Sequence, residues 1–142
     1  MKQIKILLKE KGSKVFTISP NDTVYKAIET LSAKDIGALV VTDDDKVVGI
    51  FTERDYAREV ILKDRSSQKT IVSEIMNTDV VYVLPEHTVS ECMALMTDKR
   101  IRHLPVIDNG KLIGMISIGD LVKSIISEQE FTIEQLENYI RG

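Results

Sequence analysis

The chain has 142 residues, 43% of them hydrophobic and 29% charged, which is enough apolar material for one compact core. Its net charge of −3, without a long basic run, argues against nucleic-acid binding, which usually needs a basic patch. Charged residues interrupt the N-terminal stretch, and no apolar stretch approaches the roughly 18 residues of a membrane span, so we expect neither a secretory signal nor a membrane partner. The one cysteine, Cys92, cannot form an internal disulfide and favours a reducing cytoplasm.

Residues 1–65 predict a β-α-β-β-α unit with an additional N-terminal helix. The extended segment 15–18 should end before Pro20, because proline cannot donate to a continuing strand ladder. Thr23 is a natural N-cap for a helix with apolar residues at helical spacing, namely Val24, Ala27, Ile28 and Leu31. Apolar runs at 38–41 and 47–51 flank a turn and predict a hairpin, and residues 53–62 predict a second helix.

The same elements recur when the sequence is shifted by 65 positions, so residues 66–127 form a second copy. Residues 63–69 make a polar link, and 128–142 form a helical tail outside the repeat. Two copies are too few for an open solenoid, so we expect an α/β fold in which they pack face to face with pseudo-two-fold symmetry. Matching pairs include Pro20 with Pro85, Thr23 with Thr88, Leu39 with Leu104, Gly49 with Gly114 and Asp55 with Asp120.

The sharpest motif lies where the last strand of each copy enters its final helix. It contains a glycine, two apolar residues, a hydroxyl, two variable positions and an aspartate, and it spans residues 49–55 and 114–120. A hydroxyl followed three residues later by a carboxylate is typical of a capping box. The same helix N-terminus also suits phosphate, and a short carboxylate there can accept both hydroxyls of a ribose. A capping box does not require an arginine between its two residues. The positive charge of Arg54 can instead bind a phosphate.

These features resemble the cystathionine β-synthase (CBS) domain, present as a tandem pair called a Bateman module. The resemblance covers about residues 10–127. It rests on the segments ending at Pro20 and Pro85, the runs 36–41 and 102–106, and the two glycine-to-aspartate motifs. The chain is similar to the small stand-alone bacterial members, which carry no attached enzyme or transporter.

The resemblance implies a regulatory module that binds adenosine-containing ligands, such as AMP, ADP, ATP or NAD, in clefts between the copies. No metal is required. Carried over to this chain, Asp55 and Asp120 take the ribose hydroxyls, and Thr52, Arg54 and Ser117 are phosphate candidates. Backbone around Ala38, Val40, His103 and Pro105 lines the adenine slots, and Thr17 lies near the start of the Asp55 cleft.

The two implied sites are unequal. Arg102 and His103 stand where the first copy has Gly37 and Ala38, so they are local phosphate donors for the Asp120 site. The counterpart of Arg54 is Gly119, and that of Thr17 is Tyr82. The role of His103 is open: it either contacts the ligand or is a structural histidine, because histidine serves both purposes.

An enzyme is the weakest hypothesis. No nucleophile has an adjacent base, no P-loop lysine pattern is present, and two distant histidines with one cysteine do not make a metal set. Cys92 occupies a core position of its helix, so a buried inert thiol is expected. The remaining alternatives are a nucleotide sensor with an unidentified target protein, and a protein-interaction adaptor that binds no ligand. In either case we expect a homodimer through the helices starting at Glu53 and Ile118, helped by Ile133, Leu136 and Ile140.

Overall fold

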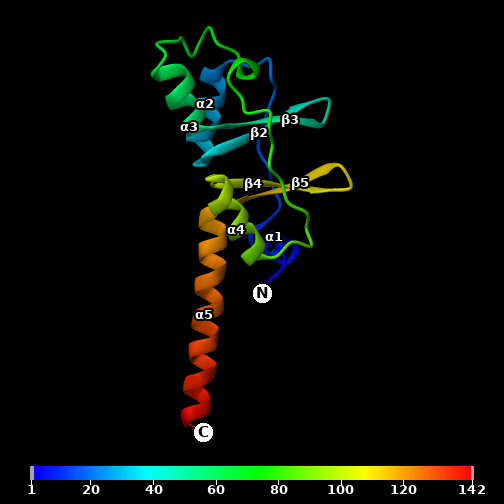
Figure 1. The fold of residues 1–142 in the computed structure, drawn as a ribbon, viewed down its shortest axis with the longest axis vertical. Helices are drawn as coiled ribbons and strands as arrows, with labels where there is room; N and C mark the ends of the chain where they lie inside the picture. Colours follow the sequence, from blue (N-terminus) through cyan, green and yellow to red (C-terminus); the bar gives the residue numbers. More distant parts are fainter. Residues whose placement is uncertain (1, 142) are drawn as a thin grey trace. The chain divides into compact units, whose positions relative to one another are not determined.

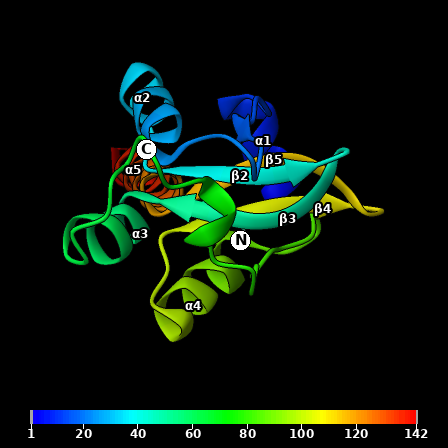
Figure 2. The same ribbon diagram turned by 90° about the horizontal axis from the view of Figure 1, so that it is seen from above.

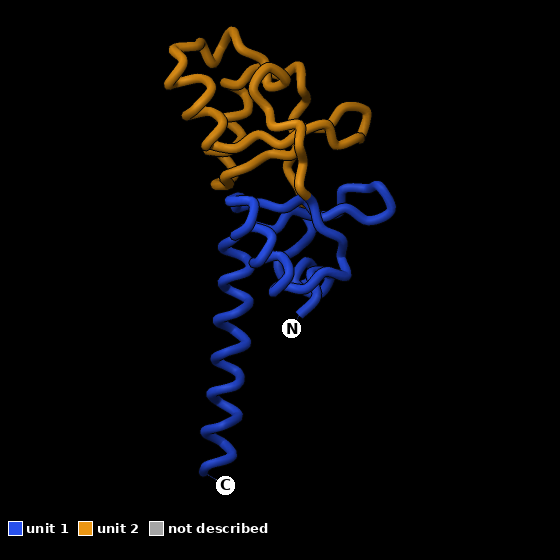
Figure 3. Tube along the Cα trace, in the orientation of Figure 1, with its two compact units in different colours: residues 1–13, 82–142 blue, residues 14–81 orange. Residues whose placement is uncertain are grey.

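The structure, a computed structural model, describes residues 2–141 (Figure 1). One compact unit is formed by residues 14–81, and the other combines the chain up to residue 13 with the chain from residue 82 onward (Figure 3). The elements in chain order are α1 (Ile4–Lys11), β1 (Thr17–Ile18), α2 (Val24–Lys34), β2 (Ala38–Asp43), β3 (Lys46–Thr52), α3 (Glu53–Tyr56), the π-helical turn η1 (Ala57–Ile61), the 3-10 turn η2 (Val72–Glu74), α4 (Val89–Lys99), β4 (His103–Asp108), β5 (Lys111–Ser117) and α5 (Ile118–Arg141).

The unit of residues 14–81 is built on a three-stranded sheet in the order β1-β2-β3. β1 runs parallel to β2 and pairs Thr17 with Val40, whereas β3 is antiparallel to β2. In Figures 1 and 2, α2 and α3 lie near the strand ends opposite the β2–β3 turn. The apolar faces of these elements meet in a core that includes Leu39, Val41 and Phe51, all fully buried.

The other unit repeats this sheet with the same register. Ala38 lies opposite Thr52 in β2–β3, and His103 lies opposite Ser117 in β4–β5. Both hairpins shift register at the same point, after Val41 and after Val106. The α/β fold of two repeats that the sequence predicted is confirmed. The extended segments are shorter than expected: β1 covers only two residues, and the second copy keeps a single bridge between Val83 and Val106.

Each unit is completed by a segment that precedes the other repeat in the sequence. The Ile4 amide donates to the carbonyl of His87 (2.8 Å), and Leu8 lies where a side chain on Gly114 would stand. In the other unit η2 takes the same place: the Val72 amide donates to the carbonyl of Asp22 (2.8 Å), and Met76 closes over Gly49. Only glycine leaves room for these neighbours, so both glycines of the repeated motif have a packing reason.

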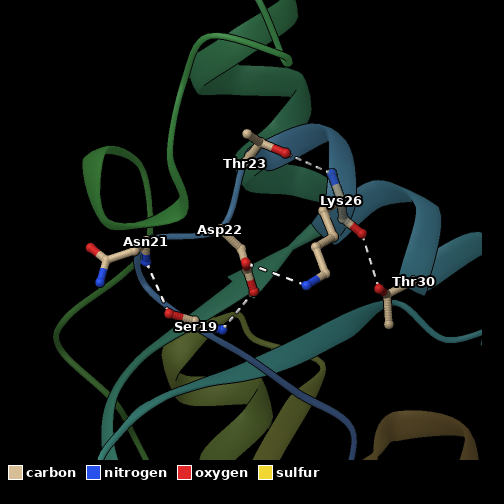
Figure 4. Close-up of polar contacts among 6 residues, drawn as sticks. All are labelled: Ser19, Asn21, Asp22, Thr23, Lys26 and Thr30. Atoms are coloured by element: carbon tan, nitrogen blue, oxygen red, sulfur yellow. Dashed lines mark hydrogen bonds and ion pairs between the residues drawn. The ribbon is translucent and has the colours of Figure 1, made fainter.

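The start of α2 shows why its sequence begins a helix there (Figure 4). The Thr23 hydroxyl accepts the Lys26 amide (3.1 Å), and Asp22 pairs with the Lys26 ammonium at 3.4 Å. The Asp22 carboxylate also accepts the Ser19 amide (3.2 Å), which fixes the turn that contains Pro20. The helix ends at Asp35 and its counterpart α4 at Arg100, both in the left-handed conformation that stops a helix.

The last helices of the two copies differ in a way that the repeat does not predict. In the first copy the expected helix 53–62 is only a short α-helix followed by η1, where the Leu62 amide reaches back to the Ala57 carbonyl. In the second copy the expected helix 118–127 and the separate tail are one continuous α-helix, α5. Nothing between Ser127 and Phe131 breaks it, because that stretch lacks glycine and proline.

Replacing Thr88 with alanine should lower the free energy of unfolding by about 1 kcal/mol. Thr88 caps α4: its hydroxyl accepts the Glu91 amide (3.2 Å), and its own amide donates to Glu91 (3.0 Å). Thr97→Ala is the matched control, because Thr97 lies exposed on the same helix and bonds only back along it to the Met93 carbonyl. Urea unfolding that showed equal losses for both variants would contradict the cap assignment.

Candidate functional site

The first strand-to-helix motif forms a complete capping box. The Asp55 carboxylate accepts the Thr52 amide (2.9 Å) and the Thr52 hydroxyl (3.0 Å), while the Thr52 oxygen accepts the Asp55 amide (3.2 Å). Both side chains are half-buried, and Arg54 between them is exposed. The capping role predicted from the sequence is therefore present, and it holds Asp55 in a fixed orientation.

The second motif repeats these bonds and adds a cation. The Asp120 carboxylate accepts the Ser117 amide (2.9 Å), and the Ser117 hydroxyl accepts the Asp120 amide (3.1 Å). The Lys11 ammonium, at the end of α1, donates to the same Asp120 oxygen at 2.7 Å and to the Met115 carbonyl at 2.8 Å. Lys11 thus ties α1 both to the edge of β5 and to the start of α5.

A backbone hydrogen bond in each copy joins the strand entrance to the helix start. The Glu53 amide donates to the Gly37 carbonyl (3.2 Å), and the Ile118 amide donates to the Arg102 carbonyl (2.9 Å). This bond, with the strand register, brings Ala38 next to the first motif and Arg102 and His103 next to the second. Arg102 is exposed, His103 is half-buried and Ala38 is buried.

The remaining candidate residues lie further along the strands. Val40 is buried, and its backbone pairs with the exposed Thr17 on one side and with β3 on the other. Pro105 is also buried, and its carbonyl accepts the Val83 amide at 3.0 Å. The backbone around these two residues is therefore engaged in the sheets. Ala38 and His103, at the first residues of β2 and β4, lie outside the pairing with β1 or Val83.

The two equivalent aspartates differ in ionisation. Burial raises the pKa of Asp55 above its ordinary value, and the hydrogen bonds from Thr52 offset this only in part. Burial acts in the same direction on Asp120, but the Lys11 ammonium and the Ser117 amide outweigh it and lower the pKa of that carboxyl. The copies are therefore unequal at the carboxylate itself as well as at the neighbouring basic residues.

Burial lowers the pKa of His103 below its ordinary value of 6.5. The nearby Asp120 carboxylate opposes this effect, whereas Arg102 and Lys11 reinforce it. His103 is accordingly harder to protonate than a free imidazole, so it adds positive charge to the Asp120 site only as the pH becomes more acidic.

Sequence reasoning missed Lys11. It precedes the region in which the two copies align at 65 positions, and no motif contains it. The stretch from Leu8 to Ile18 is longer than the equivalent stretch from Met76 to Val83, and this extra length includes the residue that reaches Asp120. This difference in length becomes visible only in the structure, where Leu8 lies against Gly114 and Met76 lies against the equivalent Gly49.

Lys11→Met should raise the pKa of Asp120, because burial is then opposed only by the hydrogen bonds from Ser117. In the native protein the lowered pKa stabilises the fold above pH 3.8, and that contribution is lost as pH falls through the folded-state pKa. The ion pair is partly exposed, so the variant should lose about 0.5–1 kcal/mol at pH 7. Lys9→Met, on the same helix, is the control.

An NMR titration of the Asp120 carboxyl, with urea unfolding at pH 7 and pH 3, measures both effects. The stability difference between Lys11→Met and the native protein should shrink at pH 3, because protonation of Asp120 removes the charge with which Lys11 pairs. An unchanged Asp120 pKa in Lys11→Met would contradict the assignment.

The one cysteine among the described residues, Cys92, has a free and buried thiol. Burial, reinforced by the nearby Glu91, raises the pKa of the Cys92 thiol to about 11, so the thiolate nucleophile is scarce at pH 7. No three histidine, cysteine, aspartate or glutamate residues within 2–141 lie close enough to hold a metal ion. A surface hollow is lined by Lys2, Ser127, Glu128, Phe131 and Thr132, none of which belongs to either motif. No helix in the described part of the chain is both long and apolar enough to cross a bilayer.

Comparison with known proteins gives a consistent family. The model of the CBS domain matches residues 11–62 and 72–127. A CBS-domain protein from Burkholderia ambifaria MC40-6 has a similar structure, with a TM-score of 0.87 at 54% identity, over 90% of this chain and 96% of that one. The CBS domain-containing protein CBSX3, mitochondrial, of Arabidopsis thaliana is 43% identical over 127 residues, which is 86% of this chain.

A more distant solved structure shares the fold alone. The CBS domain pair of protein MJ0100, in complex with 5-methylthioadenosine and S-adenosyl-L-methionine, has a TM-score of 0.80 at 22% identity, over 90% of this chain and 98% of that one. Some curated relatives are longer than the match. This chain spans 62% of the mitochondrial Arabidopsis protein and 22% of CBSCBSPB5 from the same plant.

Proposed function

Because the chain belongs to the CBS domain family, we propose that it is a non-catalytic regulatory module that binds adenosine-containing ligands and senses nucleotide or energy state. The ligands are AMP, ADP, ATP or NAD, and no metal is required. The observation that carries the proposal is the pair of fixed carboxylates, Asp55 and Asp120, each held by a hydroxyl residue at the start of a helix. The MJ0100 pair, which has the same fold, carries adenosyl ligands and supports this ligand class.

In this proposal Asp55 and Asp120 accept the ribose hydroxyls. Both carboxylates are already oriented, Asp55 by the Thr52 amide and hydroxyl and Asp120 by the Ser117 amide and the Lys11 ammonium, so binding does not have to order them. Asp120 must also share its charge with Lys11. A ligand at that site therefore either displaces the ammonium or uses it as a further donor.

Phosphate binding is assigned to different residues in the two copies. Thr52 and Arg54 serve the first site, and Ser117, Arg102 and His103 serve the second. Adenine is placed against the strand entrances at Ala38 and His103, near Val40 and Pro105, with Thr17 at the start of the first site. Both sites therefore bind the same class of ligand, but the affinity of each site depends on the phosphate charge through different residues.

The second candidate function is a protein-interaction adaptor without ligand. The observation that favours it is the ion pair of Lys11 with Asp120, which satisfies one candidate ribose carboxylate without any ligand. We propose a homodimer in either case, with an unidentified target protein and no nucleic acid. A reducing compartment such as the cytoplasm fits the free thiol of Cys92.

Mass spectrometry of small molecules released from the purified, denatured protein tests this function. The expected result is an adenosine-containing compound that is lost from an Asp55→Ala, Asp120→Ala double variant. Release of only a guanosine or other non-adenine compound would contradict the ligand class. Release of no compound, together with no binding of added adenosine ligands, would favour the adaptor.

A further inference from the structure

The second half of α5 buries none of its side chains against the other described residues. Its only buried side chains, Leu121 and Ser124, lie in the first two turns, where the helix packs against α4 and β5. Every residue from 129 to 141 is exposed, and Figure 3 shows the helix continuing beyond the rest of its unit. A solitary helix of this length is marginal in water, so its stability requires packing that one copy does not supply.

The exposed face carries a heptad pattern. Steps of four and three residues alternate along a stripe that we call the α5 stripe: Val122, Ile126, Gln129, Ile133, Leu136 and Ile140. Its apolar members are exposed from 41% at Val122 to 81% at Ile140. The first two stripe residues, Val122 and Ile126, lie on the part of α5 that packs on its unit, but on the exposed side of the helix, away from the buried Leu121 and Ser124. A spacing of 3.5 residues is the pattern of a helix that winds around another helix.

We propose that the α5 stripe pairs with the α5 stripe of a second copy as a parallel two-stranded coiled coil. In this register Ile126, Ile133 and Ile140 occupy the a positions, and Val122, Gln129 and Leu136 occupy the d positions. β-Branched residues at a with leucine at d favour two parallel strands. Gln129 is a single polar residue in the seam, and in a parallel pair it faces Gln129 of the other helix, so that the two amides can hydrogen-bond to each other.

Gln129, more than the charges beside the seam, favours the parallel direction, because a fully overlapped antiparallel pair would place it against Ile133. The e positions hold Lys123, Glu130 and Glu137, and the g positions hold Ile125, Thr132 and Tyr139. In a parallel pair each e position faces a g position of the other helix, so the glutamates meet uncharged side chains. In a fully overlapped antiparallel pair e positions face one another, so Glu130 would face Glu130 and Glu137 would face Lys123. The same helix therefore matches a parallel copy of itself better than an antiparallel one.

The first test is the mass of the full chain in solution. Sedimentation equilibrium in the micromolar range should give twice the 16.0 kDa of one chain. Leu136→Asp should halve that mass, whereas Gln135→Asp, which adds the same charge outside the stripe, should leave it unchanged. Thermal unfolding at low concentration should be similar for both, because neither residue packs on the body. A monomeric native protein, or a dimer unaffected by Leu136→Asp, would overturn the proposal.

The second test reads the direction of the helices. Gln129→Cys and Ile140→Cys, made separately, should both give disulfide-linked dimers on mild oxidation, because equivalent seam positions adjoin throughout a parallel pair. An antiparallel pair brings equivalent residues together only near its axis and can link at most one of these two positions. Gln135→Cys and the native chain, whose Cys92 is fully buried, are the controls. Failure of either seam cysteine to cross-link above these controls would overturn the parallel arrangement.

Discussion

Asp55→Ala and Asp120→Ala should each remove one adenosine-ligand site, so that calorimetric titration gives one site per chain in place of two. A ribose bound through both hydroxyls depends on a carboxylate acceptor, and alanine leaves those hydroxyls unpaired in a partly buried place. The double variant should bind no adenosine ligand. We expect the surviving site of each single variant to keep its affinity, because the two carboxylates belong to separate capping boxes.

The control for this prediction comes from a third capping box in the chain. Glu91 accepts the Thr88 amide (3.0 Å) and hydroxyl (3.1 Å), as Asp55 does with Thr52. Glu91→Ala therefore removes an equivalent cap without touching a candidate site. If it reduced the stoichiometry as Asp55→Ala does, the aspartates would be acting through the fold, and their assignment to ribose would be wrong.

Arg54→Ala should weaken AMP at the first site more than it weakens adenosine, by about 1.5–3 kcal/mol, the usual loss for a hydrogen bond to a charged group. Arg102→Ala should have the same effect at the second site. Measuring each arginine variant in the background that retains only the relevant aspartate separates the two sites. Adenosine provides the control, because it has the same base and ribose without the phosphate.

The second site should also respond to pH in a way that the first does not. Protonation of His103 adds a positive charge beside Asp120, Arg102 and Lys11, but its lowered pKa moves this gain to a more acidic pH than that of a free imidazole. AMP affinity at the second site should therefore rise only in that acidic range, as long as the phosphate keeps its charge.

For the arginine variants, equal weakening of AMP and adenosine would contradict the phosphate assignment.

Much of the fold follows from local sequence patterns. The apolar stripes and caps at Thr23 and Thr88 mark two helices, and the paired hydrophobic runs mark two hairpins with one register. The shift of 65 positions predicts the repeat because the two hairpins and caps have the same lengths. The motif hydroxyls and carboxylates were also predictable as capping boxes, since that geometry depends on residues only three apart.

The features that sequence reasoning missed depend on packing between distant segments. Residues 2–13 complete the unit of the second repeat, and η2 completes that of the first, through bonds that no local pattern encodes. Lys11 reaches Asp120 because its segment is longer than its counterpart, a difference outside the aligned repeat. A helix end at residue 127 was expected only because the repeat ends there. The residues of α5 around that point contain no glycine or proline that would break the helix.

The most direct test of the central claim is calorimetric titration of the full chain with AMP, ATP and NAD against GMP and GTP. The account predicts saturable binding of at least one adenosine compound and weaker binding of its guanosine counterpart. Backbone at the strand entrances around Ala38 and His103 can match the adenine edge, but it leaves the guanine carbonyl without a donor. Equal affinity for adenosine and guanosine nucleotides, or no binding of any adenosine compound, would contradict it.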